Sequence, residues 1–232
     1  MIVDAPSDGS GSGGSGSDGS DGSAGSGGSA VTDVCQMTAA SAPQTRGQLG
    51  STDGGSTGPN LICPAGELPV GFAFDTSSKA PPEWSQQAVG VTHVRCATIA
   101  ARSDGTVHAT PDATLLEVTT GPCNDWPPFV PGGELDCPDG SVVVAMSGNE
   151  AHAGGTRSLF DTVAMTCAVL DLTGAPTAVT SQVVFADTAH NTDRPEAPAC
   201  GAGEVVVQLA TRTGCAQDAL ALQCAKLSCP SR

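Results

Sequence analysis

Apolar and polar residues alternate with a period of two in three short segments, and each segment ends on a cysteine. The segments are GVTHVRC ending at Cys96, DTVAMTC ending at Cys167 and DALALQC ending at Cys224. Because successive side chains of a strand point to opposite faces, the pattern predicts three half-buried strands. The residues two and four positions before each cysteine are expected to face inward: Val94 and Thr92, Met165 and Val163, Leu222 and Leu220.

A second strand-like run precedes each of these segments. The runs are CPAGELPVGFAF from Cys63, CPDGSVVVAMSG from Cys137 and CGAGEVVVQLAT from Cys200. Each one reads as a cysteine, a turn rich in Pro or Gly and an apolar strand. Together with the closing segment, each run predicts an antiparallel hairpin whose two strands are joined by a polar loop of variable length.

The cysteines are placed to staple these hairpins, because an antiparallel pair brings the start of one strand next to the end of its partner. We therefore predict the disulfides Cys63–Cys96, Cys137–Cys167 and Cys200–Cys224. Each bridge is expected to stabilise its unit by about 3–4 kcal/mol through loop entropy. The chain has 10 cysteines, an even number, and contains no CxxC pair that would indicate a zinc or redox site.

The segments after Cys96 and Cys167 each predict two more strands joined by a turn, so we expect the full repeat to contain about four strands. The third copy stops short after Cys224, and residues 34–62 resemble the segments missing from it. We expect residues 34–62 to complete the third repeat and to close the ring, which a Cys35–Cys229 bridge would reinforce. Cys123 and Cys215 then pair by elimination.

Composition divides the chain into two parts. Residues 1–30 contain 10 Gly, 9 Ser and 4 Asp without any Lys or Arg, so we expect residues 1–33 to form a disordered tether. Residues 34–232 are rich in Val, Thr, Gly, Pro and Ala, which favours a single all-β repeat domain over an α/β enzyme fold. A β-sandwich is the alternative arrangement of the same strands.

A formal net charge of -15 with only 9 Lys and Arg argues against nucleic acid and anionic membranes as partners. No stretch approaches the 18 apolar residues of a membrane-spanning helix. The disulfides favour an oxidising, extracellular or cell-surface location. MIVDAPSDGS lacks the features of a signal peptide, so we expect that a leader lies upstream of Met1 or has been removed.

Few residues indicate chemistry at a site. The histidines, of which His93 is expected to face away from the apolar side of its strand, are too far apart in sequence for a helical metal pair, so we expect no metal, no cofactor and no catalytic residue. Trp84 and Trp126 lie in loops flanked by Pro, where they either contact a ligand or cap the core. Asp161 and Asp218 recur six residues before Cys167 and Cys224, where the first copy has Gly90. They either accept backbone hydrogen bonds in the hairpins or bind a ligand at one end of the molecule.

Three hairpin units that open on Cys-Pro-x-Gly or Cys-Gly-x-Gly, two of them closing on Asp-x-apolar-x-apolar-x-Cys, resemble the vitelline membrane outer layer protein family over residues 35–229. That resemblance implies a β-prism of three four-stranded antiparallel sheets about a pseudo-threefold axis, and it implies interaction with carbohydrate. The Cys-Pro-x-Gly phrase also resembles dermatopontin-like extracellular proteins. The chain lacks the tryptophans and the doubled Asp of the vitelline family, so no individual binding residue is carried over.

Three functions fit these observations. The first is a non-enzymatic secreted or surface-tethered protein that binds an extracellular polymer, with a glycan or polysaccharide as the expected partner. The second is a structural envelope or matrix component without a specific ligand. The third, less favoured, is an exported hydrolase that uses acids from the long loops.

Overall fold

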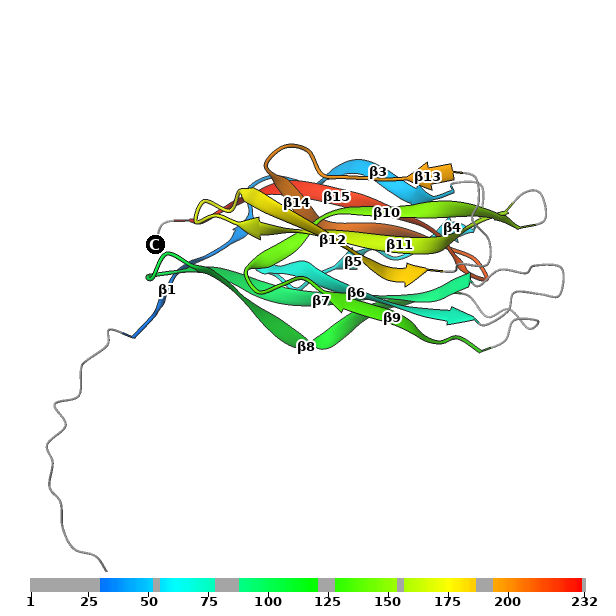
Figure 1. The fold of residues 1–232 in the computed structure, drawn as a ribbon, viewed down its shortest axis with the longest axis horizontal. Helices are drawn as coiled ribbons and strands as arrows, with labels where there is room; N and C mark the ends of the chain where they lie inside the picture. Colours follow the sequence, from blue (N-terminus) through cyan, green and yellow to red (C-terminus); the bar gives the residue numbers. More distant parts are fainter. Residues whose placement is uncertain are drawn as a thin grey trace, which may run out of the picture. The chain divides into compact units, whose positions relative to one another are not determined.

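All the elements of the computed structural model are β-strands (Figure 1). It describes residues 30–51, 55–77, 88–120, 128–153, 157–186 and 194–230. Residues 31–232 belong to one folded unit. None of the described segments forms a helix of the length and apolarity that crossing a membrane requires.

The strands form three antiparallel sheets. The first sheet contains β9 (Val130–Asp136), β6 (Glu67–Ser77), β7 (Ala88–Arg102) and β8 (Val107–Thr119) in this spatial order, and β1 (Asp33–Gln36) pairs with the end of β7. The second sheet contains β13 (Arg194–Glu196), β10 (Ser141–Ala153), β11 (Arg157–Leu170) and β12 (Pro176–Ala186). The third sheet has β14 (Glu204–Thr213) and β15 (Gln217–Ser228) at its centre.

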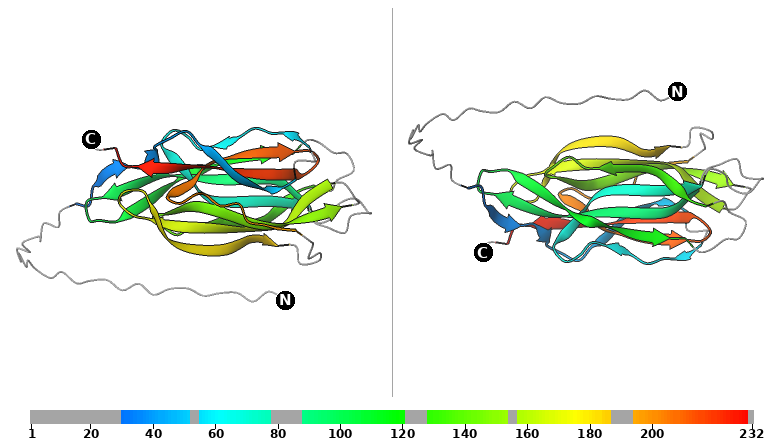
Figure 2. Two further views of the ribbon diagram at one scale, coloured as in Figure 1. Left: turned by 90° about the horizontal axis from the view of Figure 1, so that it is seen from above. Right: turned by 90° about the horizontal axis from the view of Figure 1, so that it is seen from below.

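The N-terminal part of the chain supplies the outer strands of the third sheet. β4 (Ser56–Thr57) and β5 (Leu61–Ile62) pair with β14, whereas β2 (Thr38–Ala39) and β3 (Gln44–Gly50) pair with β15. Each sheet therefore has a central hairpin between two outer partners. β1 and the end of β15 lie at the same end of the folded unit (Figure 2).

The turn that opens each hairpin explains the repeated Cys-Pro-x-Gly and Cys-Gly-x-Gly phrases. The residue after each cysteine accepts a backbone hydrogen bond from the N–H group three positions further on, at Glu67, Ser141 and Glu204. The third residue of each turn has a positive φ, which Gly adopts without strain: the residues are Gly66 (86°), Gly140 (70°) and Gly203 (74°). The phrase is thus a turn signal that starts the central strand.

Each hairpin carries the predicted bridge. Cys63–Cys96, Cys137–Cys167 and Cys200–Cys224 join strands whose Cα atoms lie 5.6–5.7 Å apart. The fourth described bridge, Cys35–Cys229, ties β1 to the residue after β15. Cys215 is also disulfide-bonded, but Cys123 lies outside the described residues.

The residues predicted to face inward all do so. They are between 0% and 1% exposed: Thr92, Val94, Val163, Met165, Leu220 and Leu222. All of them except Thr92 belong, with the cysteines of the three hairpin bridges, to the larger of two hydrophobic core clusters or pack against it. The smaller cluster lies around Cys35, Met37 and Ile99, where β1 meets the turn ends of the hairpins. In a β-prism, the inner faces of three sheets bury their side chains around one common axis. The β-sandwich alternative is wrong because there are three sheets and not two.

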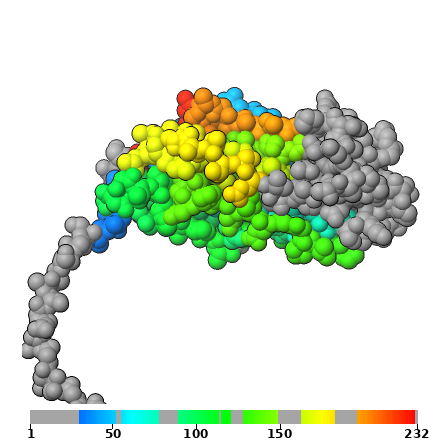
Figure 3. All heavy atoms as spheres, viewed as in Figure 1, coloured from blue at the N-terminus to red at the C-terminus, as the bar shows by residue number. Residues whose placement is uncertain are grey.

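Two expected strand boundaries are wrong. The segment after Cys96 does not begin a new strand, because β7 continues through it to Arg102, and β11 similarly continues past Cys167 to Leu170. No turn-forming residue follows either cysteine directly. The fourth strand of the first unit is instead β9, which immediately precedes the next opening cysteine. β9 also lies beside β12, where the first and second sheets adjoin (Figure 3).

Candidate functional site

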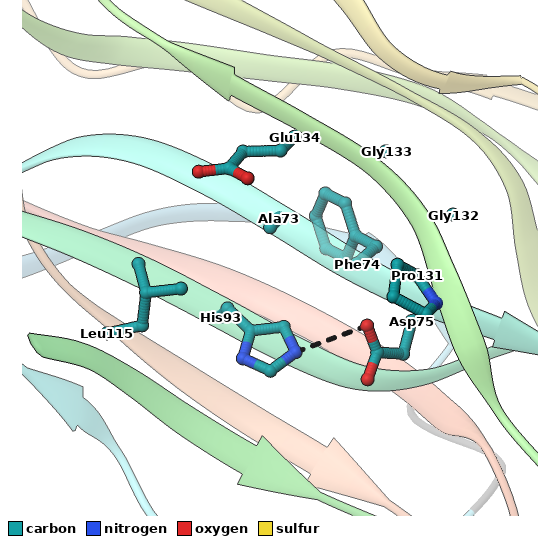
Figure 4. A pocket seen from close by; sticks show the side chains of 9 residues that line it. All are labelled: Ala73, Phe74, Asp75, His93, Leu115, Pro131, Gly132, Gly133 and Glu134. Carbon is teal, nitrogen blue, oxygen red and sulfur yellow. Dashed lines mark ion pairs between the residues drawn. The ribbon is translucent and has the colours of Figure 1, made fainter. Parts of the chain in front are cut away.

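A pocket of about 560 Å³ lies on the outer face of the first sheet (Figure 4). It is built from the middle of β6 and from the strands beside it. The residues that line it are Ala73, Phe74, Asp75, His93, Leu115, Pro131, Gly132, Gly133 and Glu134.

One row of side chains across the sheet forms the centre of the pocket. Glu117 of β8, His93 of β7, Ala73 of β6 and Glu134 of β9 are successive cross-strand partners. Cross-strand partners lie on the same face of a sheet. The short side chain of Ala73 therefore forms a low floor between His93 and Glu134 (Figure 4).

Two carboxylates bracket His93. Its Nε2 lies 3.4 Å from Oδ1 of Asp75, and its Nδ1 lies 3.8 Å from Oε2 of Glu117. The His93 side chain is 15% exposed. The imidazole therefore lies mostly buried between the carboxylates of Asp75 and Glu117. The expectation that His93 faces away from the apolar side of its strand is confirmed, because Val94 is buried in the core.

A second row holds the only described Arg of the site. The guanidinium of Arg95 donates from Nε to Asp136 over 2.8 Å and from Nη2 to Glu134. Burial lowers the pKa of Arg95, but the hydrogen bonds and charges of Asp136 and Glu134 outweigh burial and raise that pKa above its ordinary value. The guanidinium stays charged and fixes both carboxylates.

Gly71 of β6 makes this pairing possible. It is the cross-strand partner of both Arg95 and Asp136, so the ion pair passes over it. A Cβ at this position would overlap Oδ1 of Asp136. The absence of a side chain at Gly71 therefore lets charged side chains from the two neighbouring strands come into contact above β6.

The walls of the pocket are apolar and lie on its two outer strands. Leu115 of β8 is on one side, and Pro131 of β9 is on the other (Figure 4). β9 has a bulge here, since Gly133 and Pro131 pair with the consecutive residues Phe74 and Asp75. The bulge leaves Gly132 against Thr76, where a Cβ would not fit.

The arrangement is suited to binding a polyhydroxylated ligand. Carboxylate oxygens accept hydrogen bonds from hydroxyl groups, and the apolar walls offer contact area to carbon-bound hydrogens. Among the described residues around the pocket there are four carboxylates and one permanent cation, Arg95. The acids are Asp75, Glu117, Glu134 and Asp136. Among the described residues, no group of three or more His, Cys, Asp or Glu side chains is arranged to hold a metal ion.

Trp84 and Trp126 lie outside the described residues. The strand ends that flank their segments are described, however, and they are close to the pocket. Ser77 and Ala88 flank residues 78–87 and pair with each other, and Val130 follows shortly after residues 121–127 and pairs with Thr76. The described residues that flank both segments therefore lie at the Asp75 end of the pocket.

The two recurring aspartates are not part of this pocket. Asp161 lies in β11 of the second sheet, and its side chain lies outside what the structure describes. Asp218 is the second residue of β15 in the third sheet, is 5% exposed and lies against Gly55 and Gly214. A ligand contact by either residue stays a prediction.

The first repeat has Gly90 at the position equivalent to these aspartates, and the structure gives a reason. The ring of Phe129 occupies the place where a Cβ of Gly90 would lie. Phe129 directly precedes β9, the strand that forms one wall of the pocket. The absence of a side chain at Gly90 thus allows Phe129 to pack there.

Sequence reasoning did not select Arg95, Glu134 and Asp136 as site residues. A signal was present, because His93 and Arg95 alternate with Val94 in THVRC, and Glu134 and Asp136 alternate with Leu135 in ELD. Each triplet predicts two polar residues on one face of a strand. That the two faces coincide depends on β9 pairing with β6, which the sequence alone did not indicate.

No protein-family model and no curated protein matches the chain. Among solved structures, Calystegia sepium agglutinin matches at a TM-score of 0.51 with 12% identity, over 80% of this chain and 98% of that chain. Frutalin from Artocarpus incisa matches at 0.46 with 12% identity, over 80% and 97%. Calsepa lectin in complex with a biantennary N-glycan matches at 0.47 with 12% identity, over 79% and 97%. The first likeness shows the β-prism fold, and the resemblance to the vitelline family stays a prediction.

Proposed function

We propose that this protein is a non-enzymatic carbohydrate-binding protein of the extracellular space or cell surface, and that it binds glycan in the pocket on the first sheet. The observation that carries the proposal is the row Glu117, His93, Ala73 and Glu134, in which a low floor separates hydrogen-bonding side chains. An agglutinin shares the β-prism fold. That likeness supports carbohydrate binding at the level of the fold.

The chemistry of the pocket supports a sugar more than a flat apolar ligand. The carboxylates of Asp75 and Glu134 reach the pocket from opposite sides, so they can accept bonds from hydroxyl groups on both edges of one ring. Leu115 and Pro131 provide apolar contact beside them. A few placed polar groups among apolar walls are typical of small-molecule sites.

Trp84 and Trp126, which are predicted from the sequence either to contact a ligand or to cap the core, are proposed here as aromatic contacts of the same ligand. The described residues that flank their segments, among them Ser77 and Val130, lie at the Asp75 end of the pocket. An aromatic face on such a segment would extend the binding surface beyond the pocket. The extracellular location is supported by the disulfides, which persist in oxidising compartments.

The test is a glycan and polysaccharide array probed with the disulfide-bonded chain and two variants. Ala73→Phe fills the floor of the pocket. Ser147→Phe places the same side chain at the equivalent position of the second sheet, counted from Cys137 as Ala73 is counted from Cys63. We expect the wild type and Ser147→Phe to bind the same glycans and Ala73→Phe to lose at least tenfold in affinity.

Three results would contradict the proposal. A blank array favours the structural-component function, and equal binding by Ala73→Phe and wild type places the site elsewhere. Cleavage of a bound polysaccharide, followed by product chromatography, would revive the hydrolase hypothesis. Circular dichroism of both variants verifies that each retains the β-sheet spectrum.

A further inference from the structure

The charges around the pocket are unbalanced. Among the described residues around the pocket, four carboxylates face the single guanidinium of Arg95, which is an excess of three negative charges. Arg95 is hydrogen-bonded to Glu134 and Asp136. The guanidinium of Arg95 therefore neutralises carboxylates on one side of the pocket only.

On the other side, Asp75 and Glu117 share His93 as their partner. Within the part of the chain that the structure describes, neither carboxylate forms an ion pair with Lys or Arg. The Asp75 side chain is 25% exposed and lines the pocket. A ligand in the pocket therefore meets a partly desolvated carboxylate whose only ionic partner among the described residues is an imidazole.

An ammonium group is the complement of such a carboxylate. It offers three donors and a full positive charge, and charge-assisted hydrogen bonds are stronger than neutral ones. A carboxylated or sulfated sugar would instead bring a like charge to within a few ångströms of Asp75 or Glu134. The same pocket would thus discriminate among sugars by charge.

We propose that the pocket selects sugars that carry a free amino group, with the ammonium against Asp75 and the ring between Leu115 and Pro131. This inference rests on the proposed function and narrows its ligand to an oligosaccharide or polysaccharide of 2-amino-2-deoxy sugars. The pocket, rather than the overall acidity of the chain, confers the selectivity. Anionic glycans are excluded from it.

The experiment compares two trisaccharides with the same sugar backbone, glucosamine trimer, whose amines are free and charged, and its fully N-acetylated form, whose amides are neutral. Isothermal titration calorimetry of the full chain is run below the pKa of the sugar amine, at low and at physiological salt. We expect the free-amine trimer to bind about tenfold more tightly, as one added charge-assisted hydrogen bond implies. Higher salt should reduce this preference without abolishing it.

Two variants separate the pocket from the overall charge. Asp75→Asn removes the negative charge with little change of shape, because an amide is nearly isosteric with a carboxylate. The second sheet also has an Asn, Asn149, at the equivalent position. Asp33→Asn removes the same charge from β1, where Asp33 pairs with Arg102, nine residues along β7 from His93. We expect Asp75→Asn to equalise the affinities for the two trimers and Asp33→Asn to leave the tenfold preference unchanged.

The outcomes distinguish this inference from the proposed function. If both trimers bind equally, or the acetylated one binds more tightly, the charge selection is wrong and carbohydrate binding stands. If a preference for the amine survives in Asp75→Asn, or falls equally in Asp33→Asn, general attraction to an acidic chain explains it and the inference is overturned. If neither trimer binds and the glycan array is blank, the proposed function fails as well.

Discussion

The outer face of the first sheet and the outer face of the second sheet carry different side chains at equivalent positions of the repeat. Counted back from the closing cysteine, His93 and Arg95 on β7 correspond to Ala164 and Thr166 on β11. Counted from the opening cysteine, Asp75 corresponds to Asn149. Charged residues that form the pocket of the first sheet are thus small or neutral in the second.

The inner faces of the same two sheets are alike. Val94 and Met165 are equivalent and both almost fully buried, as are Phe72 and Met146. Inward side chains of the three sheets pack against one another, so each must fit the side chains of two neighbouring sheets. Outward side chains face solvent, and packing against other sheets does not restrict them. The repeat therefore keeps its inner faces alike, which maintains the fold, whereas one outer face carries the charged side chains of the candidate site.

The third sheet supports this interpretation. At the positions of Gly71 and Arg95 it has Gln208 and Gln223, which hydrogen-bond to each other across β14 and β15. At the position of His93 it has Ala221. An uncharged pair therefore replaces the network of ion pairs, and we expect one glycan site per chain.

The largest expected effect would test whether the inner faces are equivalent. Removing a hairpin bridge, by Cys63→Ala with Cys96→Ala or by Cys137→Ala with Cys167→Ala, should lower the free energy of unfolding by about 3.5 kcal/mol in either case. The reason is that the bridges span similar sequence separations, 33 and 30 residues. Equilibrium urea unfolding measures both. A loss from one sheet that is twice the loss from the other would break the equivalence.

A smaller effect should distinguish the outer faces. Gly71→Ala places a Cβ against Asp136 beneath the Arg95 ion pair, and such overpacking costs about 1–3 kcal/mol. The equivalent residue of the second sheet is Ala145, so Ala145→Gly makes the reverse change and should cost about 0.5–1 kcal/mol from backbone entropy. Urea unfolding gives both values, and Gly71→Ala should in addition weaken glycan binding.

If Gly71→Ala proved neutral in stability and in binding, the close approach of Arg95 to Asp136 would not matter. Retained binding with reduced stability would separate the ion pair from the site.

The smallest expected effect concerns the third sheet and depends on pH. Arg46 of β3 donates to Glu204 at the start of β14 over 2.7 Å and 2.5 Å, and this hydrogen bond and charge lower the pKa of Glu204. A lowered pKa in the folded state stabilises the protein fully above the ordinary glutamate pKa of about 4.3, and this contribution is lost as the pH falls through the folded value.

Arg46→Gln should therefore lower the urea midpoint more at pH 7 than at pH 3. Arg102→Gln is the control, because its partner Asp33 is more exposed than Glu204, and its effect at pH 7 should be smaller. An equal effect of Arg46→Gln at both pH values would show that the Arg46 side chain acts through packing rather than charge.

Much of the fold could be predicted from the sequence because it depends on residues that are close together in the chain. The Cys-Pro-x-Gly turn and the alternation before Cys96 fix a strand, its inward face and its bridge within about 35 residues. The outer face of the first sheet could not be predicted in the same way. Glu134 reaches Ala73 only because β9 returns to pair with β6, about 60 residues earlier in the chain, and no local pattern encodes that register.

The central claim is that glycan binds on the outer face of the first sheet and not on its equivalents. A titration followed by ¹H–¹⁵N correlation spectra, with glucosamine trisaccharide added to the isotopically labelled chain, tests it residue by residue. We expect shifted amide signals at Ala73, His93 and Glu134. The signals of Ser147 and Ala164, the second-sheet equivalents of Ala73 and His93, should be unchanged. Shifts confined to the second sheet, or spread equally over both, would contradict it.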